Sequence, residues 1–288
     1  MSLLNMQNLL GRILIDDQLR NAFFKDPERI FGGYELTQRE MESLRNLDAD
    51  RLNFYSSGLK RRRIDIALKA FPLTKLLVSD EIKRFVAMYC HEFTPTLDSA
   101  APALREHIGF YQFLVRLIAD GKLQSKYLKD ILEYEKNLFF IGNGMEASSD
   151  ASEFARANRI LPDDFTMDLV WNLKPTRGAH VEASSFTYDV IEVASYLRGR
   201  EVPDLSPKTT YLLFSKIPNE LGVRTSKINK ATLDLFSLCD GARTTGAIIS
   251  KLAGANDLEM ERDGAKLAGT CLPIFRQLCK FAVITFKP

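Results

Sequence analysis

Histidine and cysteine are scarce in this sequence of 288 residues. The histidines are His91, His107 and His180, and the cysteines are Cys90, Cys239, Cys271 and Cys279. The histidines form no His-x-x-x-His motif, and the cysteines have no Cys-x-x-Cys spacing, so we expect no metal site and no disulfide framework in this chain. Because each cysteine lies among apolar residues at helical spacing, we expect small buried side chains rather than nucleophiles.

The motifs of common enzyme classes are also missing. The sequence has no Gly-x-x-x-x-Gly-Lys phosphate loop, no Gly-x-Ser-x-Gly elbow and no Gly-x-Gly-x-x-Gly motif after a strand. We therefore predict that the chain is not an enzyme and carries no catalytic residues.

The sequence lacks long apolar runs and a large excess of one charge. No run approaches the roughly 18 apolar residues of a membrane span, and Asn5, Gln7 and Asn8 interrupt the segment where a signal peptide would be apolar. We therefore expect a cytoplasmic protein with no membrane partner. The net charge of +2 gives no reason to expect nucleic acid as a partner.

Helical periodicity dominates the first half of the chain. Apolar residues recur at three- and four-residue steps between Leu3 and Phe23, which predicts one amphipathic helix that ends before Pro27. Thr37 and Glu40 form a capping box for the next helix. A third helix is expected from about Asp48 to Ala70, and three more at 82–90, 108–118 and 127–139. The side chains expected to face inward from the third helix are Leu52, Tyr55, Leu59, Ile66 and Ala67.

Strand patterns appear after a stretch rich in Gly, Ser and Asp. The length favours two domains, and we predict a helical domain at 1–145, a linker at 146–159 and a second domain at 160–288. Strands are expected at 166–173, 179–185, 209–216, 222–228 and 281–286, and helices at 188–197, 230–239, 244–253 and 259–279. The predicted fold class is α+β, with a helical bundle followed by a domain that contains a small antiparallel sheet.

The last third of the chain resembles a known peptide-binding module. Two strands precede Leu-Phe-Ser-Leu-Cys-Asp-Gly-Ala-Arg-Thr-Thr (Leu235 to Thr245), and further helices follow. This order resembles the PqqD-type recognition element, a small winged-helix domain. The resemblance implies that the domain binds the leader of a ribosomally synthesised precursor peptide while another protein modifies that peptide.

Residues 45 to 140 resemble a second family. The segments that carry the likeness are Asn53-Phe-Tyr-Ser-Ser-Gly-Leu-Lys-Arg-Arg-Arg, Leu68-Lys-Ala-Phe-Pro-Leu-Thr-Lys-Leu-Leu and Phe85-Val-Ala-Met-Tyr-Cys-His. They are similar to the N-terminal domain of partner proteins of multinuclear non-heme iron-dependent oxidases. The combination of both halves resembles the TglI-type partner subunits of 3-thiaglutamate biosynthesis, and MbnC is a shorter relative. The first 44 residues are not matched to this pattern.

The second resemblance implies a division of labour between two subunits. A TglH-like oxidase would hold the iron and excise the β-carbon of the precursor's C-terminal cysteine, so no cofactor is expected in this chain. Dioxygen-activating iron needs converging imidazole and carboxylate ligands, which three scattered histidines do not readily supply. We therefore predict a non-catalytic subunit that binds the leader and forms a heterodimer with the oxidase.

Two sets of residues are candidates for leader binding. In a winged-helix peptide binder an edge strand accepts the peptide as a further strand, and the last long helix lines the groove. The candidates are Val223, Arg224, Thr225 and Lys227 in the strand, and Ala268, Leu272 and Phe275 in the helix. The alternative is that the strand belongs to a closed sheet and that its charges are simply solvated.

The only concentrated basic run is Lys60, Arg61, Arg62 and Arg63. Its ordinary interpretation is a solvated helix face, and its functional interpretation is a clamp for the acidic precursor or the oxidase. A third interpretation makes the chain a winged-helix DNA-binding or regulatory protein. The second helix of the C-terminal domain carries Lys251 as its only basic residue, which argues against DNA.

Overall fold

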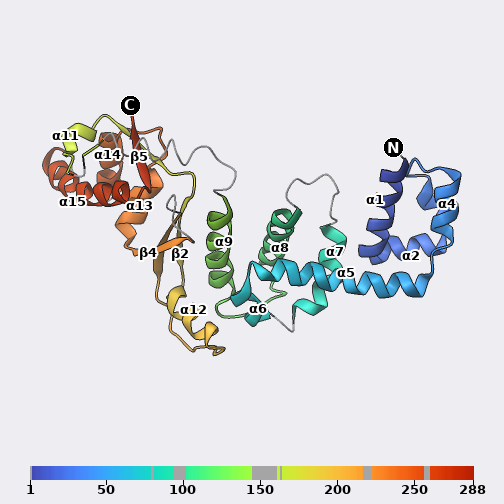
Figure 1. Cartoon of the computed structure of the whole chain (residues 1–288). Coiled ribbons are helices and arrows are strands. Elements are labelled where there is room, and N and C mark those ends of the chain that lie inside the picture. The colour runs from blue at the N-terminus through green and yellow to red at the C-terminus, as the bar shows by residue number, and fades with distance from the viewer. Residues whose placement is uncertain are drawn as a thin grey trace. The chain divides into compact units, whose positions relative to one another are not determined.

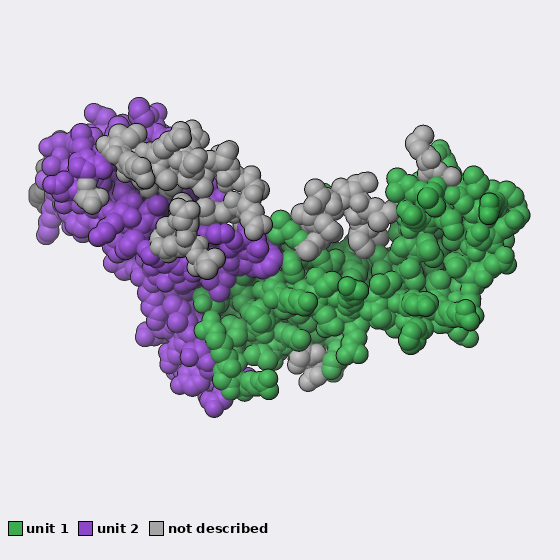
Figure 2. Space-filling model, in the orientation of Figure 1, with its two compact units in different colours: residues 1–135, 197–200 green, residues 136–196, 201–288 purple. Residues whose placement is uncertain are grey.

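The structure, a computed structural model, describes residues 2–78, 81–93, 102–144, 161–162, 164–216, 222–255 and 260–288. The chain forms two compact units, shown in Figure 2: unit 1 comprises residues 1–135 and 197–200, and unit 2 comprises residues 136–196 and 201–288. The predicted linker at 146–159 lies outside the described residues. The predicted α+β fold class is confirmed, because unit 1 is helical and the strands belong to unit 2.

Unit 1 is built from helices that end at caps and prolines. They are α1 (Ser2–Ile15), α2 (Asp17–Lys25), α3 (Pro27–Phe31), α4 (Gln38–Arg45), α5 (Ala49–Lys69), α6 (Pro72–Val78), η1 (Ile82–Phe85), α7 (Val86–Glu92), α8 (Pro102–Ala119) and the first part of α9 (Leu128–Gly144). The Thr37 and Glu40 capping box is present at the start of α4, as predicted. One core cluster contains Leu9, Ile13, Phe23, Phe31, Leu44 and Leu52.

The prediction of one helix from Leu3 to Phe23 is wrong. The chain breaks at Asp16, whose φ of −102° and ψ of 107° are extended. The Asp16 carboxylate accepts hydrogen bonds from the amides of Gln18 and Leu19 at 2.9 and 3.1 Å, so it starts α2 as an N-cap. Because the apolar steps continue through the break, periodicity alone does not reveal it.

The inward face of α5 also differs from the prediction. Tyr55 and Leu59 are 63% and 39% exposed, whereas Ser56 and Lys60 are buried at 1% and 8%. Ser56 accepts a hydrogen bond from Arg20, and Lys60 forms an ion pair with Asp17. The helix therefore turns a polar strip toward α2, because α2 carries the complementary charges.

Unit 2 contains two small antiparallel sheets and the remaining helices (Figure 1). The elements are the end of α9, α11 (Met167–Val170), β1 (Lys174–Arg177), β2 (Val181–Phe186), most of α12 (Val190–Arg198), β3 (Thr210–Ser215), β4 (Arg224–Ile228), α13 (Lys230–Leu238), α14 (Thr245–Ala255), α15 (Met260–Lys280) and β5 (Ile284–Lys287). One sheet has the order β2-β3-β4, and β1 pairs with β5 in the other.

Two strand predictions in unit 2 need correction. The segment 166–173 contains the short helix α11 instead of a strand, and the predicted closing strand begins at Ile284 rather than at Phe281. The strand β1 was not predicted. Its sequence, Lys-Pro-Thr-Arg, has no apolar alternation, and its partner β5 lies about a hundred residues later in the chain.

The three-stranded sheet is covered on both faces. Leu213 and Ile228 contribute to the core that includes Phe275 and Leu278 of α15. On the opposite face, Asn137 of α9 donates to the Ser184 hydroxyl at 2.9 Å, and Lys216 donates to the Gly142 carbonyl at 2.5 Å. The sheet therefore lies between α15 and the end of α9, and β3 is its buried central strand.

The helix α14 offers a matched test of packing. A Cβ on Gly246 would lie 2.6 Å from Cε2 of Trp171, whereas a Cβ on Gly254 would meet nothing within 4 Å. We expect Gly246→Ala to destabilise unit 2 by about 1–3 kcal/mol through overpacking. Gly254→Ala should be neutral or stabilising by up to about 1 kcal/mol, because alanine favours a helix.

Urea unfolding followed by far-UV circular dichroism and by fluorescence of the lone tryptophan measures both effects. A Gly246→Ala variant that unfolds at the same urea concentration as the parent chain would contradict the close contact.

Candidate functional site

A pocket opens between strand β4 and the second half of helix α15. It has a cavity volume of about 180 Å³. Ser215, Arg224 and Ser226 contribute to its wall on the sheet side, and Ile274, Gln277 and Leu278 contribute to its wall on the helix side. Because polar and apolar groups meet there, the pocket suits a side chain of an elongated ligand better than a wholly apolar molecule.

The strand register explains which residues reach the pocket. Arg224, Ser226 and Ile228 pair with Ser215, Leu213 and Tyr211, so they share the face that α15 covers. Thr225 pairs with Phe214, on the opposite face. Alternation along β4 therefore sends every second side chain toward the pocket.

The pocket has a basic rim. The Cζ atom of Arg224 lies 5.2 Å from the ring centroid of Phe281, a cation–π distance. Lys227 also borders the pocket, but its Nζ atom lies 2.7 Å from the Asp189 carboxylate. Burial alone would raise the pKa of Asp189, but the hydrogen bonds from Lys227 and from the Glu192 amide outweigh it, and the pKa is lowered. Lys227 is thus partly neutralised by Asp189, and Arg224 adds a second cation to the rim.

Strand β4 is an open edge of its sheet. It is the last strand in the order β2-β3-β4. Among the described residues, no backbone hydrogen bond joins residues 223–228 to any segment other than β3. Such an edge offers amide and carbonyl groups to an extended chain.

The structure brings together part of the predicted leader-binding set. Arg224 and Lys227 border the pocket, although the register places the Lys227 side chain on the same sheet face as Thr225, away from α15. Val223 lies 3.5 Å from the Cβ position of Gly142. The predicted helix residues Ala268, Leu272 and Phe275 do not line the pocket. Phe275 is fully buried, and its ring centroid is 5.7 Å from that of Phe286.

Sequence reasoning missed the helix side of the pocket. Ile274, Gln277 and Phe281 recur at three- and four-residue steps along α15 and its end, which is a usable helical signal. The predicted closing strand began at Phe281, so this residue was not counted with the helix and the spacing was not recognised.

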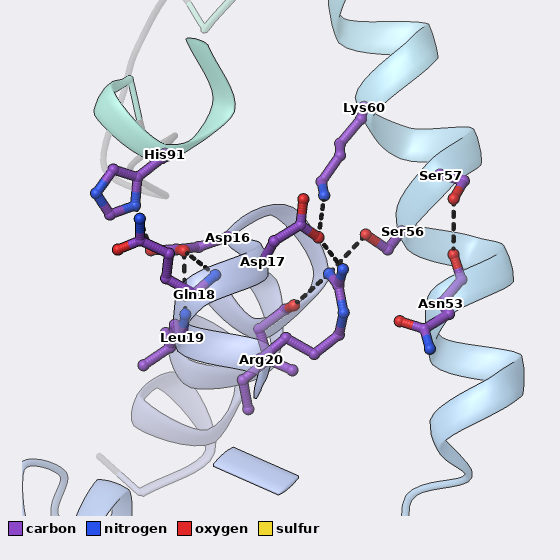
Figure 3. Close-up of polar contacts among 11 residues, drawn as sticks. Asp16, Asp17, Gln18, Leu19, Arg20, Asn53, Ser56, Ser57, Lys60 and His91 are labelled. Atoms are coloured by element: carbon purple, nitrogen blue, oxygen red, sulfur yellow. Dashed lines mark hydrogen bonds and ion pairs between the residues drawn. The ribbon is translucent and has the colours of Figure 1, made fainter. Parts of the chain in front are cut away.

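The basic run of α5 divides into two buried and two exposed residues. Lys60 pairs with Asp17 beside Arg20 and Ser56, as Figure 3 shows, and Arg63 pairs with Glu106. Burial, followed by the charge of Arg20, lowers the pKa of Lys60. Arg61 and Arg62 are exposed. A role as a clamp therefore stays a prediction for Arg61 and Arg62, while Lys60 and Arg63 are engaged within unit 1.

The cysteines offer no reactive thiolate in this structure. Burial raises the pKa of all four thiols, and it raises those of Cys239 and Cys279 to about 12. Thiols with such pKa values are protonated at neutral pH and are poor nucleophiles. Within the described ranges, no group of three or more His, Cys, Asp or Glu side chains is placed to hold a metal ion.

Two findings concern the whole chain. None of the helices in the described segments is long and apolar enough to cross a membrane. In comparisons with known proteins, no family model and no curated protein sequence matches this chain, so its membership of either family it resembles stays a prediction.

Proposed function

We propose that this chain is a substrate-recognition subunit that binds the leader of a ribosomally synthesised precursor peptide along β4. It also docks an iron-dependent oxidase, which modifies the C-terminal cysteine of the precursor by β-carbon excision. The observation that carries the proposal is the open edge of β4 directly beside the pocket formed with α15. The resemblances of residues 45–140 and 209–286 indicate the class of peptide and the class of oxidase in this proposal.

An extended leader would pair with β4 through main-chain hydrogen bonds, and its alternate side chains would point toward α15. One apolar side chain of moderate size fits the pocket against Leu213, Ile228 and Leu278. An acidic side chain next to it would meet the guanidinium of Arg224. The main chain provides affinity and these two contacts provide selectivity.

The contribution of this chain to the reaction is proximity. A leader held on unit 2 keeps the C-terminal cysteine of the same peptide near the docked oxidase, at an effective concentration on the order of millimolar for a short flexible connection. No side chain of this subunit needs to take part in bond making. The iron and its ligands belong to the oxidase in this proposal.

Two measurements test the proposal. A labelled leader titrated into the full chain is expected to bind saturably, and the unlabelled leader is expected to compete. The oxidase alone is expected to modify the full-length precursor far more slowly than the oxidase with this chain. If the oxidase modified the precursor at the same rate without this chain, the proposal would be wrong. Salt-dependent binding of duplex DNA without leader binding would favour a DNA-binding protein instead.

A further inference from the structure

Helix α5 exposes two adjacent aromatic side chains to solvent. Phe54 is 78% exposed and Tyr55 is 63% exposed, which makes Phe54 more exposed than any other large hydrophobic side chain in the described residues. Their ring centroids lie 6.0 Å apart in an edge-to-face arrangement. Single exposed apolar residues are ordinary, but a contiguous aromatic pair on one helix marks an interaction site.

The aromatic pair belongs to a larger helix face, which we call the α5 face. It consists of Arg51, Phe54, Tyr55, Gly58, Arg61 and Arg62, which helical spacing places on one side of α5. A Cβ on Gly58 would meet nothing within 4 Å, so the helix backbone is open to close approach between Tyr55 and Arg62. The face thus combines an open stretch of helix backbone at Gly58 with aromatic and guanidinium groups on either side of it.

The charges of the α5 face indicate the chemistry of its partner. Within the described residues neither Arg61 nor Arg62 forms an ion pair, and the contact of Arg51 with Asp48 is long, at 3.8 Å, between exposed side chains. These guanidinium groups attract carboxylates. Asp50 and Asp65 are also exposed on α5, so the charge of the helix surface is mixed, which suits separate carboxylates opposite the arginines better than a continuous polyphosphate chain. The observations favour an acidic protein surface over nucleic acid.

We infer that the α5 face is the docking surface for a folded protein that presents carboxylates around a small apolar patch. This inference rests on the proposed function, under which that protein is the oxidase subunit. Tyrosine, phenylalanine and arginine are enriched at the centres of protein interfaces, where a few side chains carry most of the binding free energy. Phe54 and Tyr55 would supply the apolar contact, and Arg62 would supply the charge-assisted hydrogen bonds.

The test compares variants of the full chain in binding to the iron oxidase subunit that the proposed function makes its partner. Phe54→Ser and Arg62→Glu are each expected to weaken the complex by about 30-fold or more, as for residues at the centre of an interface. The matched controls are Tyr196→Ser, an aromatic residue 40% exposed on α12, and Arg39→Glu, an exposed arginine on α4. Both controls are expected to bind the oxidase within about threefold of the parent chain, because they lie outside the α5 face.

Leader titration of the same samples separates this inference from the proposed function. Every variant should bind the leader as the parent chain does, since Phe54, Arg62 and Arg39 belong to unit 1 and Tyr196 does not line the pocket. Unchanged oxidase binding by Phe54→Ser and Arg62→Glu overturns the inference, even if leader binding holds. So does a parent chain that binds the leader but not the oxidase. Binding of single-stranded DNA that Arg62→Glu abolishes, with oxidase binding intact, would assign the face to nucleic acid. If Phe54→Ser fails to fold, Arg62→Glu decides alone.

Discussion

Replacement of Glu106 by alanine is expected to destabilise unit 1 by about 3–5 kcal/mol, because it leaves a buried guanidinium without its counter-charge. The Nε and Nη2 atoms of Arg63 donate to the two carboxylate oxygens of Glu106 at 3.1 and 3.0 Å. The side chains of Arg63 and Glu106 are only 12% and 14% exposed. Little water is available to replace the lost carboxylate.

The substitution of Glu106 also affects Tyr89, because the Tyr89 hydroxyl donates a hydrogen bond to the same carboxylate. The Tyr89 hydroxyl donates to Glu106 Oε1 at 2.6 Å, and the Arg63 Cζ lies 5.2 Å from the Tyr89 ring centroid. Burial, followed by the hydrogen bond to Glu106, raises the pKa of Tyr89, so the phenol stays a neutral donor. Without Glu106 this buried hydroxyl loses its carboxylate acceptor as well.

Far-UV circular dichroism during urea unfolding measures this effect, because unit 1 is helical. The double variant Arg63→Met with Glu106→Leu should lower the free energy of unfolding by less than Glu106→Ala alone does, since no unpaired charge remains. Arg61→Met, on the exposed side of the same helix, is the control and should change the free energy of unfolding by less than about 0.5 kcal/mol. A Glu106→Ala variant within about 1 kcal/mol of the parent chain would contradict the buried ion pair.

Local signals predicted much of unit 1 correctly. The start of α5 at Ala49, after the Asp48 cap, and its end at Lys69, before Pro72, agree with the predicted helix within one residue at each end. The capping box of α4 was also predicted correctly from the sequence. A cap or a proline acts within a few residues, so the sequence around it contains all the information that the backbone needs.

Two of the errors concern features that depend on distant partners. The inward face of α5 is set by Asp17 and Arg20 of another helix, and a sequence window around α5 does not contain them. Strand β1 exists because β5 pairs with it, although its own residues have weak strand character. Long-range pairing of this kind leaves no local periodicity to detect.

The candidate site was predictable on one side only. The open edge of β4 and its basic residues followed from strand alternation and from the resemblance to a recognition element, and Arg224 does border the pocket. The helix side depends on which face of α15 borders the pocket. Ile274 and Gln277 form that wall, whereas Phe275 is fully buried in the core, and the sequence alone does not distinguish these neighbouring faces.

Filling the pocket is expected to weaken leader binding by about 30- to 100-fold if one leader side chain is buried there. Burial of a leucine-sized side chain contributes about 2–3 kcal/mol, and each 1.4 kcal/mol corresponds to a factor of ten. Ser226→Leu replaces one hydroxyl oxygen by three carbon atoms in a cavity of about 180 Å³ that Ser226 itself lines. The added side chain would occupy the space of the leader's anchor without removing any hydrogen bond of β4.

The control for Ser226→Leu is Ser185→Leu. Ser185 is exposed on β2, at the other edge of the same sheet, and is not among the residues that line the pocket. Fluorescence anisotropy of a labelled leader should show a loss of affinity for Ser226→Leu and not for Ser185→Leu, while the circular dichroism of both matches the parent chain. Equal leader affinity for all three proteins would mean that the leader does not use this pocket. Binding would then have to rest on the main chain of β4 and on the charge of Arg224, without selection for an apolar leader side chain.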